Sequence, residues 1–169
     1  CIPLLNRSDI TREAVKLYNE EHHQGNTVLL HHNLFTNGIT YVDLLFDTKY
    51  VPDELIPYMG ILKSVLGYVS TEHYSYSELF NEINANTGGI SCGLQVFQKP
   101  VLSVDCARMF GVRFKSLDAG VDFAYDMVKE ILCTSKLEDE KRLREILGSM
   151  KAGLQQAIPG SGHSSAVLR

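Results

Sequence analysis

The sequence predicts an α+β fold in which an antiparallel-rich sheet of about four strands carries helices on one face. Three patterns between residues 52 and 97 support this prediction. Apolar residues recur every three or four positions over residues 55–69, which is typical of one face of a helix. Ser75 and Glu78 have the spacing of a capping box, which predicts that a second helix begins there. Apolar and polar residues then alternate over residues 90–97, as in a strand.

These three elements are expected to build most of the core. The first helix presents its apolar face to a sheet through Leu55, Met59, Leu62, Leu66 and Val69. The second helix carries Leu79, Phe80 and Ile83 and is stopped by Asn86-Thr87-Gly88-Gly89. The strand that follows is expected to be buried.

Two strands are expected before the first helix. Residues 27–32 form one strand and residues 39–46 form its return strand. Asn37-Gly38 supplies the positive φ that a hairpin turn between them needs. Residues 20–25 are expected to be a solvated, polar turn that leads into the first strand.

After the central segment, residues 99–108 are expected to form a loop or a broken strand. Alternation around Phe110, Val112 and Phe114 predicts a fourth strand. Helices are then expected over residues 118–135 and 138–158. Their inward-facing residues are Val121, Ala124, Met127, Val128, Ile131 and Leu132 in the first, and Leu143, Ile146, Leu147, Met150 and Leu154 in the second.

The polar faces of these two helices are expected to contact solvent. Lys129-Glu130 belongs to the solvated side of the first helix. In the second helix, Glu138 with Arg142 and Glu140 with Arg144 are oppositely charged pairs at four-residue spacing, which is typical of an exposed helix surface.

Residues 159–163 are expected to interrupt the last helix, and residues 164–169 to begin another. Gly160-Ser161-Gly162 could in principle bind an anion on its free amides. It lacks the lysine and the preceding strand of a nucleotide-binding loop, so a helix-to-helix turn is the favoured interpretation.

The composition indicates a protein with a conventional core. The chain has 169 residues, of which 44% are hydrophobic, and a formal net charge of −4. Its lysines and arginines are scattered, so no basic stripe suggests nucleic acid or an anionic membrane as a partner. The sequence has neither a run of about eighteen apolar residues nor a signal-peptide pattern.

The cysteines predict free thiols. Cys1, Cys92, Cys106 and Cys133 are far apart and form no Cys-x-x-Cys pair. Reduced thiols are the rule in reducing compartments, so we expect the protein in the cytoplasm or in another reducing intracellular compartment.

Several segments together resemble a known family. They are Thr36-Asn37-Gly38-Ile39, Val51-Pro52-Asp53-Glu54-Leu55-Ile56-Pro57-Tyr58, Tyr74-Ser75-Tyr76-Ser77-Glu78-Leu79 and Thr87-Gly88-Gly89-Ile90. In this order they resemble the pitrilysin/insulinase superfamily of zinc peptidases, and most of all its presequence-protease subgroup. The resemblance runs from Ile2 to the last residue and points to the first domain of the non-catalytic C-terminal half. It implies a ferredoxin-like layer of the kind that is repeated in the two halves of those enzymes.

The resemblance also implies what this segment lacks. The family binds zinc through a helix with the inverted motif His-x-x-Glu-His, in which the glutamate acts as general base. By analogy between the two halves, Gly60-Ile61-Leu62-Lys63-Ser64 stands in the place of that motif. Gly60 and Ser64 are not expected to bind zinc, and the Lys63 cation would repel the metal. The resemblance therefore implies zinc in the parent protein, with no catalytic residue and no metal ligand in this segment.

The histidines offer an alternative metal site. His22-His23 beside two glutamates, His31-His32 and His73 are candidates for a self-contained metal enzyme. Adjacent side chains on a strand point to opposite sides, so a structural interpretation is favoured for each of them.

The resemblance sets the expected domain organisation and partners. Residues 1–26 are the end of an interdomain linker, and residues 27–169 are a single α+β domain that is truncated at its last helix. The expected partners are the catalytic half of the same polypeptide and peptide substrates, without nucleic acid or membrane. An excised domain would also expose apolar surface, so self-association is expected to be possible. The residues that bind substrate are not identified by the sequence.

Two functions follow as hypotheses. In the first, the chain is a non-catalytic structural and substrate-enclosing domain of a zinc metalloendopeptidase that degrades unstructured peptides. It would act by closing a chamber and by edge-strand pairing with the peptide. In the second, the same fold serves only as an assembly or interaction domain of a non-peptidase.

Overall fold

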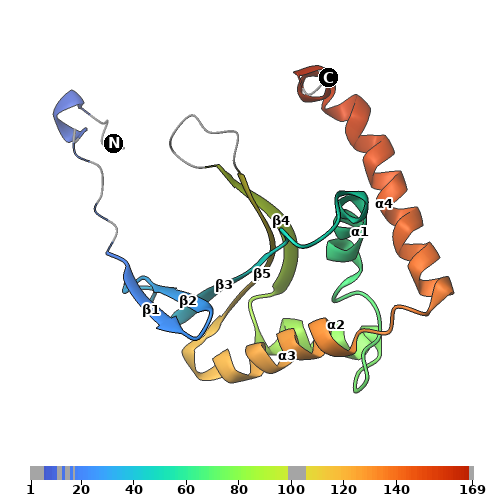
Figure 1. Cartoon of the computed structure of the whole chain (residues 1–169), viewed down its shortest axis with the longest axis horizontal. Helices are drawn as coiled ribbons and strands as arrows, with labels where there is room; N and C mark the ends of the chain where they lie inside the picture. Colours follow the sequence, from blue (N-terminus) through green and yellow to red (C-terminus); the bar gives the residue numbers. More distant parts are fainter. Residues whose placement is uncertain (1–5, 11–12, 14–15, 17, 99–105, 168–169) are drawn as a thin grey trace, which may run out of the picture. The chain divides into compact units, whose positions relative to one another are not determined.

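The computed structural model describes residues 6–10, 13, 16, 18–98 and 106–167. Helices and antiparallel sheets both occur, so the predicted α+β class is confirmed (Figure 1). Contacts within the chain divide it into two compact units, residues 1–37 and residues 38–169. In the described part of the chain, no helix is both long enough and apolar enough to cross a membrane.

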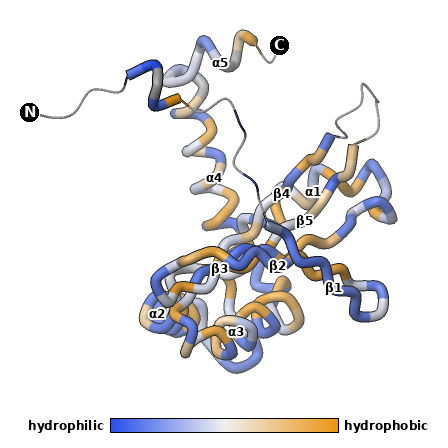
Figure 2. Tube along the Cα trace, turned by 90° about the vertical axis from the view of Figure 1, so that its left-hand side faces the viewer, coloured by the Kyte–Doolittle hydropathy of each residue, from blue (hydrophilic) through white to orange (hydrophobic). Residues whose placement is uncertain are grey.

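The first unit contains a hairpin that differs from the predicted one. Strand β1 (Glu20–Gln24) pairs antiparallel with β2 (Thr27–His31), and Gly25 between them has a φ of 61°. The expectation of a polar turn over residues 20–25 is therefore wrong, because these residues are the partner strand of β2. Both strands are exposed along their whole length, and β1 is coloured as hydrophilic in Figure 2.

The predicted pairing of residues 27–32 with residues 39–46 is also wrong. Strand β2 is already paired with β1, and β3 (Ile39–Asp47) belongs to a different sheet. Asn37 and Gly38 do have positive φ angles, of 55° and 79°, but they join the two units instead of closing a hairpin. The contacts divide the chain after Asn37. The linker over residues 1–26 and the single domain over residues 27–169 stay predictions.

The second unit is built on a three-stranded antiparallel sheet. Its strands are β3, β4 (Ile90–Gln98) and β5 (Cys106–Leu117), in the order β3-β5-β4. In the described part of the chain, one two-stranded and one three-stranded sheet thus replace the single four-stranded sheet that the sequence predicts. Strand β5 begins at Cys106, earlier than expected, and residues 99–105 lie outside the described part of the chain.

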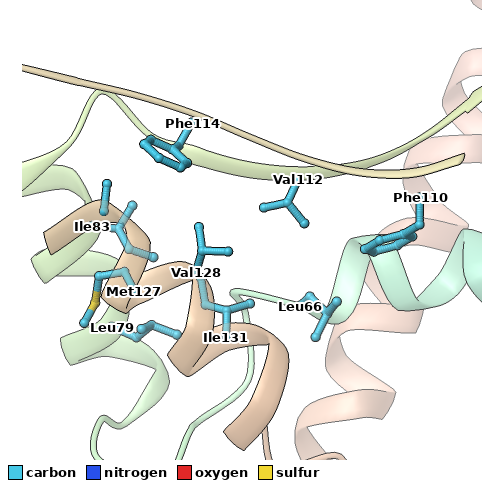
Figure 3. Close-up of a cluster of buried hydrophobic side chains, with 10 residues drawn as sticks. Leu66, Leu79, Ile83, Phe110, Val112, Phe114, Met127, Val128 and Ile131 are labelled. Carbon is cyan, nitrogen blue, oxygen red and sulfur yellow. The ribbon is translucent and has the colours of Figure 1, made fainter. Parts of the chain in front are cut away.

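One face of this sheet forms the core with three helices. They are α1 (Ile56–Val65), α2 (Tyr76–Asn86) and α3 (Val121–Thr134); short 3-10 helices, η2 (Asp53–Leu55) and η3 (Asp118–Gly120), lead into α1 and α3. Figure 3 shows side chains from β5 pointing toward those of α2 and α3. The buried cluster consists of Leu66, Leu79, Ile83, Phe110, Val112, Phe114, Ala124, Met127, Val128 and Ile131.

The sequence patterns of the core are largely confirmed. Ser75 caps α2 and Glu78 completes the capping box, as its spacing predicts. Helix α1 ends sooner than expected, because Leu66 is already extended and Gly67 has a φ of 85°. Leu66 and Val69 are nevertheless buried, beyond the end of the helix.

Some apolar residues expected to face inward are exposed. Phe80 is 54% exposed on the outer side of α2, and Leu55 is 47% exposed at the end of η2. Strand β4 was expected to be buried, but it lies at a sheet edge and is exposed from its middle onward. Among the described strands β4 pairs only with β5, which leaves one side of β4 without a strand partner.

Helix α4 (Glu140–Gly160) carries much of its apolar stripe at the surface. None of its described residues is buried, and Leu147 and Leu154 are exposed, in agreement with its alternating hydropathy in Figure 2. The helix ends at Gly160, and α5 (Gly162–Val167) follows Ser161, so the predicted interruption is confirmed at Ser161.

The charge pairs expected on α4 are partly confirmed. Glu140 and Arg144 form an ion pair with a nitrogen-to-oxygen distance of 3.7 Å. Glu138 does not pair with Arg142, because it precedes the helix. Arg142 instead pairs with Glu145 at 3.1 Å and donates to the carbonyl oxygen of Tyr68 at 2.9 Å.

Candidate functional site

Helix α1 carries Gly60, Lys63 and Ser64, the residues that the resemblance predicts to stand in the place of the inverted zinc motif. Gly60 and Ser64 are half-buried and Lys63 is exposed. A Cβ atom added at Gly60 would meet no other atom within 4 Å, so packing does not require a glycine there. Zinc prefers imidazole, thiolate and carboxylate ligands, and none of these three side chains supplies one. The helix therefore has a place in the core but no group for metal chemistry at these positions.

The histidines of the first unit lie in exposed ion pairs. On one face of the β1–β2 hairpin, Glu20 Oε2 is 3.2 Å from His31 Nδ1 and 3.9 Å from His22 Nε2. On the other face, His23 Nε2 is 2.8 Å from Glu21 Oε1. More than half of each of these side chains is exposed, so the pairs contribute little to stability.

No cluster of metal ligands is formed from the candidate residues. Over residues 6–10, 13, 16, 18–98 and 106–167, no group of three or more His, Cys, Asp or Glu side chains could hold a metal ion. His163 is exposed in α5.

His73 takes part in a half-buried polar contact that the sequence does not predict. Its backbone N–H donates to Glu130 Oε1 at 3.0 Å, and its ring Nδ1 lies 3.0 Å from Oε2. The Glu130 side chain is only 11% exposed, so its expected place on the solvated side of the helix is wrong. Burial raises the pKa of Glu130, but hydrogen bonds from Thr71, His73 and Thr134 outweigh it and lower the pKa to about 2.

This contact has a structural role. It connects the turn between α1 and α2 to α3. The hydrogen bonds stabilise the ionised carboxylate of Glu130 and occupy its lone pairs. Such a group is poorly suited to act as a general base. The sequence has no local signal for this contact, because Thr71 and His73 lie in the connection before α2 whereas Glu130 and Thr134 lie on α3.

Two apolar hollows lie beside α1 in the second unit. One, of about 460 Å³, lies between the sheet, the end of α1 and the end of α3, and is lined by Phe46, Leu62, Leu66, Phe110, Leu132, Cys133, Ser135 and Leu137. The other, of about 360 Å³, lies along α1 and is lined by Val51, Leu55, Tyr58, Met59, Ile61, Leu62, Val65, Leu137 and Leu143. Their linings are mostly apolar and lack a carboxylate or an imidazole. They are suited to packing and not to acid–base catalysis.

The two edges of the three-stranded sheet differ chemically. Edge strand β3 carries Asp43 and Asp47, and Asp43 forms a two-pronged ion pair with Arg113 of β5 on the open face. Edge strand β4 has no charged residue and no proline from Ile90 to Gln98. Its last residues are exposed, and this edge of the sheet is therefore uncharged along β4.

Comparison with known proteins decides the family. The family described as peptidase M-16C associated matches residues 1–169, which is the whole chain. The chain belongs to this family. The resemblance to a segment of presequence proteases that the sequence motifs indicate is confirmed.

Relatives of this peptidase-associated chain are much longer proteins. Protein HypA of Clostridium perfringens (strain 13 / Type A) is 39% identical over 168 residues, which cover 99% of this chain and 17% of that protein. The mitochondrial presequence protease of Yarrowia lipolytica is 28% identical, over 100% of this chain and 17% of its own length. Presequence protease 1, chloroplastic/mitochondrial, of Arabidopsis thaliana is 27% identical, over 100% of this chain and 16% of its own length. The chain therefore spans about a sixth of these relatives.

Proposed function

We propose that this chain is a non-catalytic structural domain that encloses substrate in a zinc metalloendopeptidase of the inverted-motif type, which degrades unstructured peptides. Its partner is the catalytic half of the same polypeptide, which supplies the zinc and the general base. The chain itself contributes walls and contact surfaces.

One observation carries this proposal. Helix α1 lies against the sheet, yet Gly60, Lys63 and Ser64 leave it without a zinc ligand or a general base. A helix that packs against the sheet but provides no zinc ligand and no general base can form part of the wall of a chamber. Several relatives are named as presequence proteases, which supports a peptidase as the parent protein.

The proposal is tested in the full-length protein that contains this chain. A triple variant with Gly60→Ala, Lys63→Ala and Ser64→Ala is expected to keep the wild-type zinc content and the wild-type kcat on an unstructured peptide. A control with alanine in place of the glutamate of the catalytic half's own motif is expected to be inactive. Loss of zinc or of kcat in the triple variant would overturn the non-catalytic role.

Enclosure is tested by substrate size. The full-length protein is expected to cleave an unfolded peptide and to leave the same sequence intact when it is part of a stably folded domain. If the folded domain is cut at the same rate as the peptide, residues 38–169 do not restrict access and the enclosing role is wrong.

An assembly domain without peptidase function is the second candidate. The apolar hollow along α1, with Leu55, Tyr58 and Ile61 exposed beside it, favours this candidate because such surfaces commonly pack on other domains. A full-length protein without bound zinc and without peptide cleavage would favour assembly over proteolysis.

A further inference from the structure

We draw no further inference here: the strongest candidate, the apolar hollow along α1 beside Leu55, Tyr58 and Ile61, carries none because nothing in the structure shows what covers it.

Discussion

His73 and Glu130, which are 57 residues apart in the sequence, are joined by the backbone N–H of His73 donating to the Glu130 carboxylate at 3.0 Å. The His73 ring, which is largely exposed, adds a contact at 3.0 Å, while the carboxylate is almost buried. The pair ties the turn before α2 to α3, so it stabilises the layer of helices on which the sheet packs.

Replacement of Glu130 by Gln should therefore destabilise the fold. At neutral pH we expect a loss of about 1–3 kcal/mol in the free energy of unfolding, because charge-assisted hydrogen bonds to a buried group are lost. Denaturant unfolding of the chain measures this. Glu138→Gln, at an exposed carboxylate, is the matched control and should change the free energy of unfolding little.

The effect of Glu130 should depend on pH. The pKa of this group is lowered from 4.5 to about 2 in the folded state. A carboxyl with a lowered folded pKa contributes stability that is complete above its unfolded pKa and is lost as the pH falls toward the folded pKa. The difference between wild type and Glu130→Gln should thus be constant above about pH 5 and shrink between pH 4.5 and about 2. A difference that grows over that range would contradict the role of the ionised carboxylate.

Leu62→Asp should strongly destabilise or unfold the chain. Leu62 packs against the buried cluster and lines both apolar hollows, and a carboxylate there would lie without a partner in apolar surroundings. We expect a cost of several kcal/mol in the free energy of unfolding. Thermal melting checks this, with Lys63→Asp as the exposed neighbour that should melt close to the wild type. A Leu62→Asp variant with a wild-type melting temperature would refute this placement of α1.

Lys63→Glu should create no peptidase. Glutamate would restore the residue type of the general base, but Gly60 and Ser64 would still provide no zinc ligand. The zinc content of the purified variant and its rate of peptide cleavage should both equal those of the wild-type chain. Zinc-dependent cleavage by this variant would show that the proposed correspondence with the metal motif is wrong.

Ser75→Ala should destabilise the first turn of α2. The Ser75 hydroxyl accepts from the N–H of Glu78 at 3.4 Å, and the Glu78 carboxylate accepts from the N–H of Ser75 at 2.9 Å. Loss of the cap should cost about 1 kcal/mol in the free energy of unfolding, which denaturant titration measures. Ser77→Ala, in the same helical turn and outside the capping box, should lower the free energy of unfolding less. If both variants lose the same free energy of unfolding, loss of the cap is not the cause.

The patterns that the sequence predicts well are local ones. Three-to-four spacing, the capping box of Ser75 and Glu78 and the alternation around Phe110 each depend on residues that are neighbours along one element. The buried residues of α3 were predicted for the same reason, and they pack as expected. The family could also be recognised, because its motifs are spread in a fixed order along the chain.

The errors concern pairings between distant segments. The sequence offers two turns next to β2, one at Gly25 and one at Asn37-Gly38, and either could close a hairpin. The structure uses the turn at Gly25, so β2 pairs with β1 and not with β3. From its position in the helical pattern, Glu130 is predicted to be solvated. In the folded chain Thr71, His73 and Thr134 donate hydrogen bonds to its carboxylate. The exposure of Leu94 and Val96 likewise follows from the position of β4 at a sheet edge.

By itself, the sequence determined the α+β class, the family, most of the helices and strands, and the lack of zinc-ligand side chains at Gly60, Lys63 and Ser64. Only the tertiary structure decided the strand order β3-β5-β4, the burial of Glu130 and the free edge of β4. The physical reason is that side-chain periodicity records which face of an element is buried, whereas strand order and polar contacts depend on backbone hydrogen bonds and packing between segments far apart in the chain.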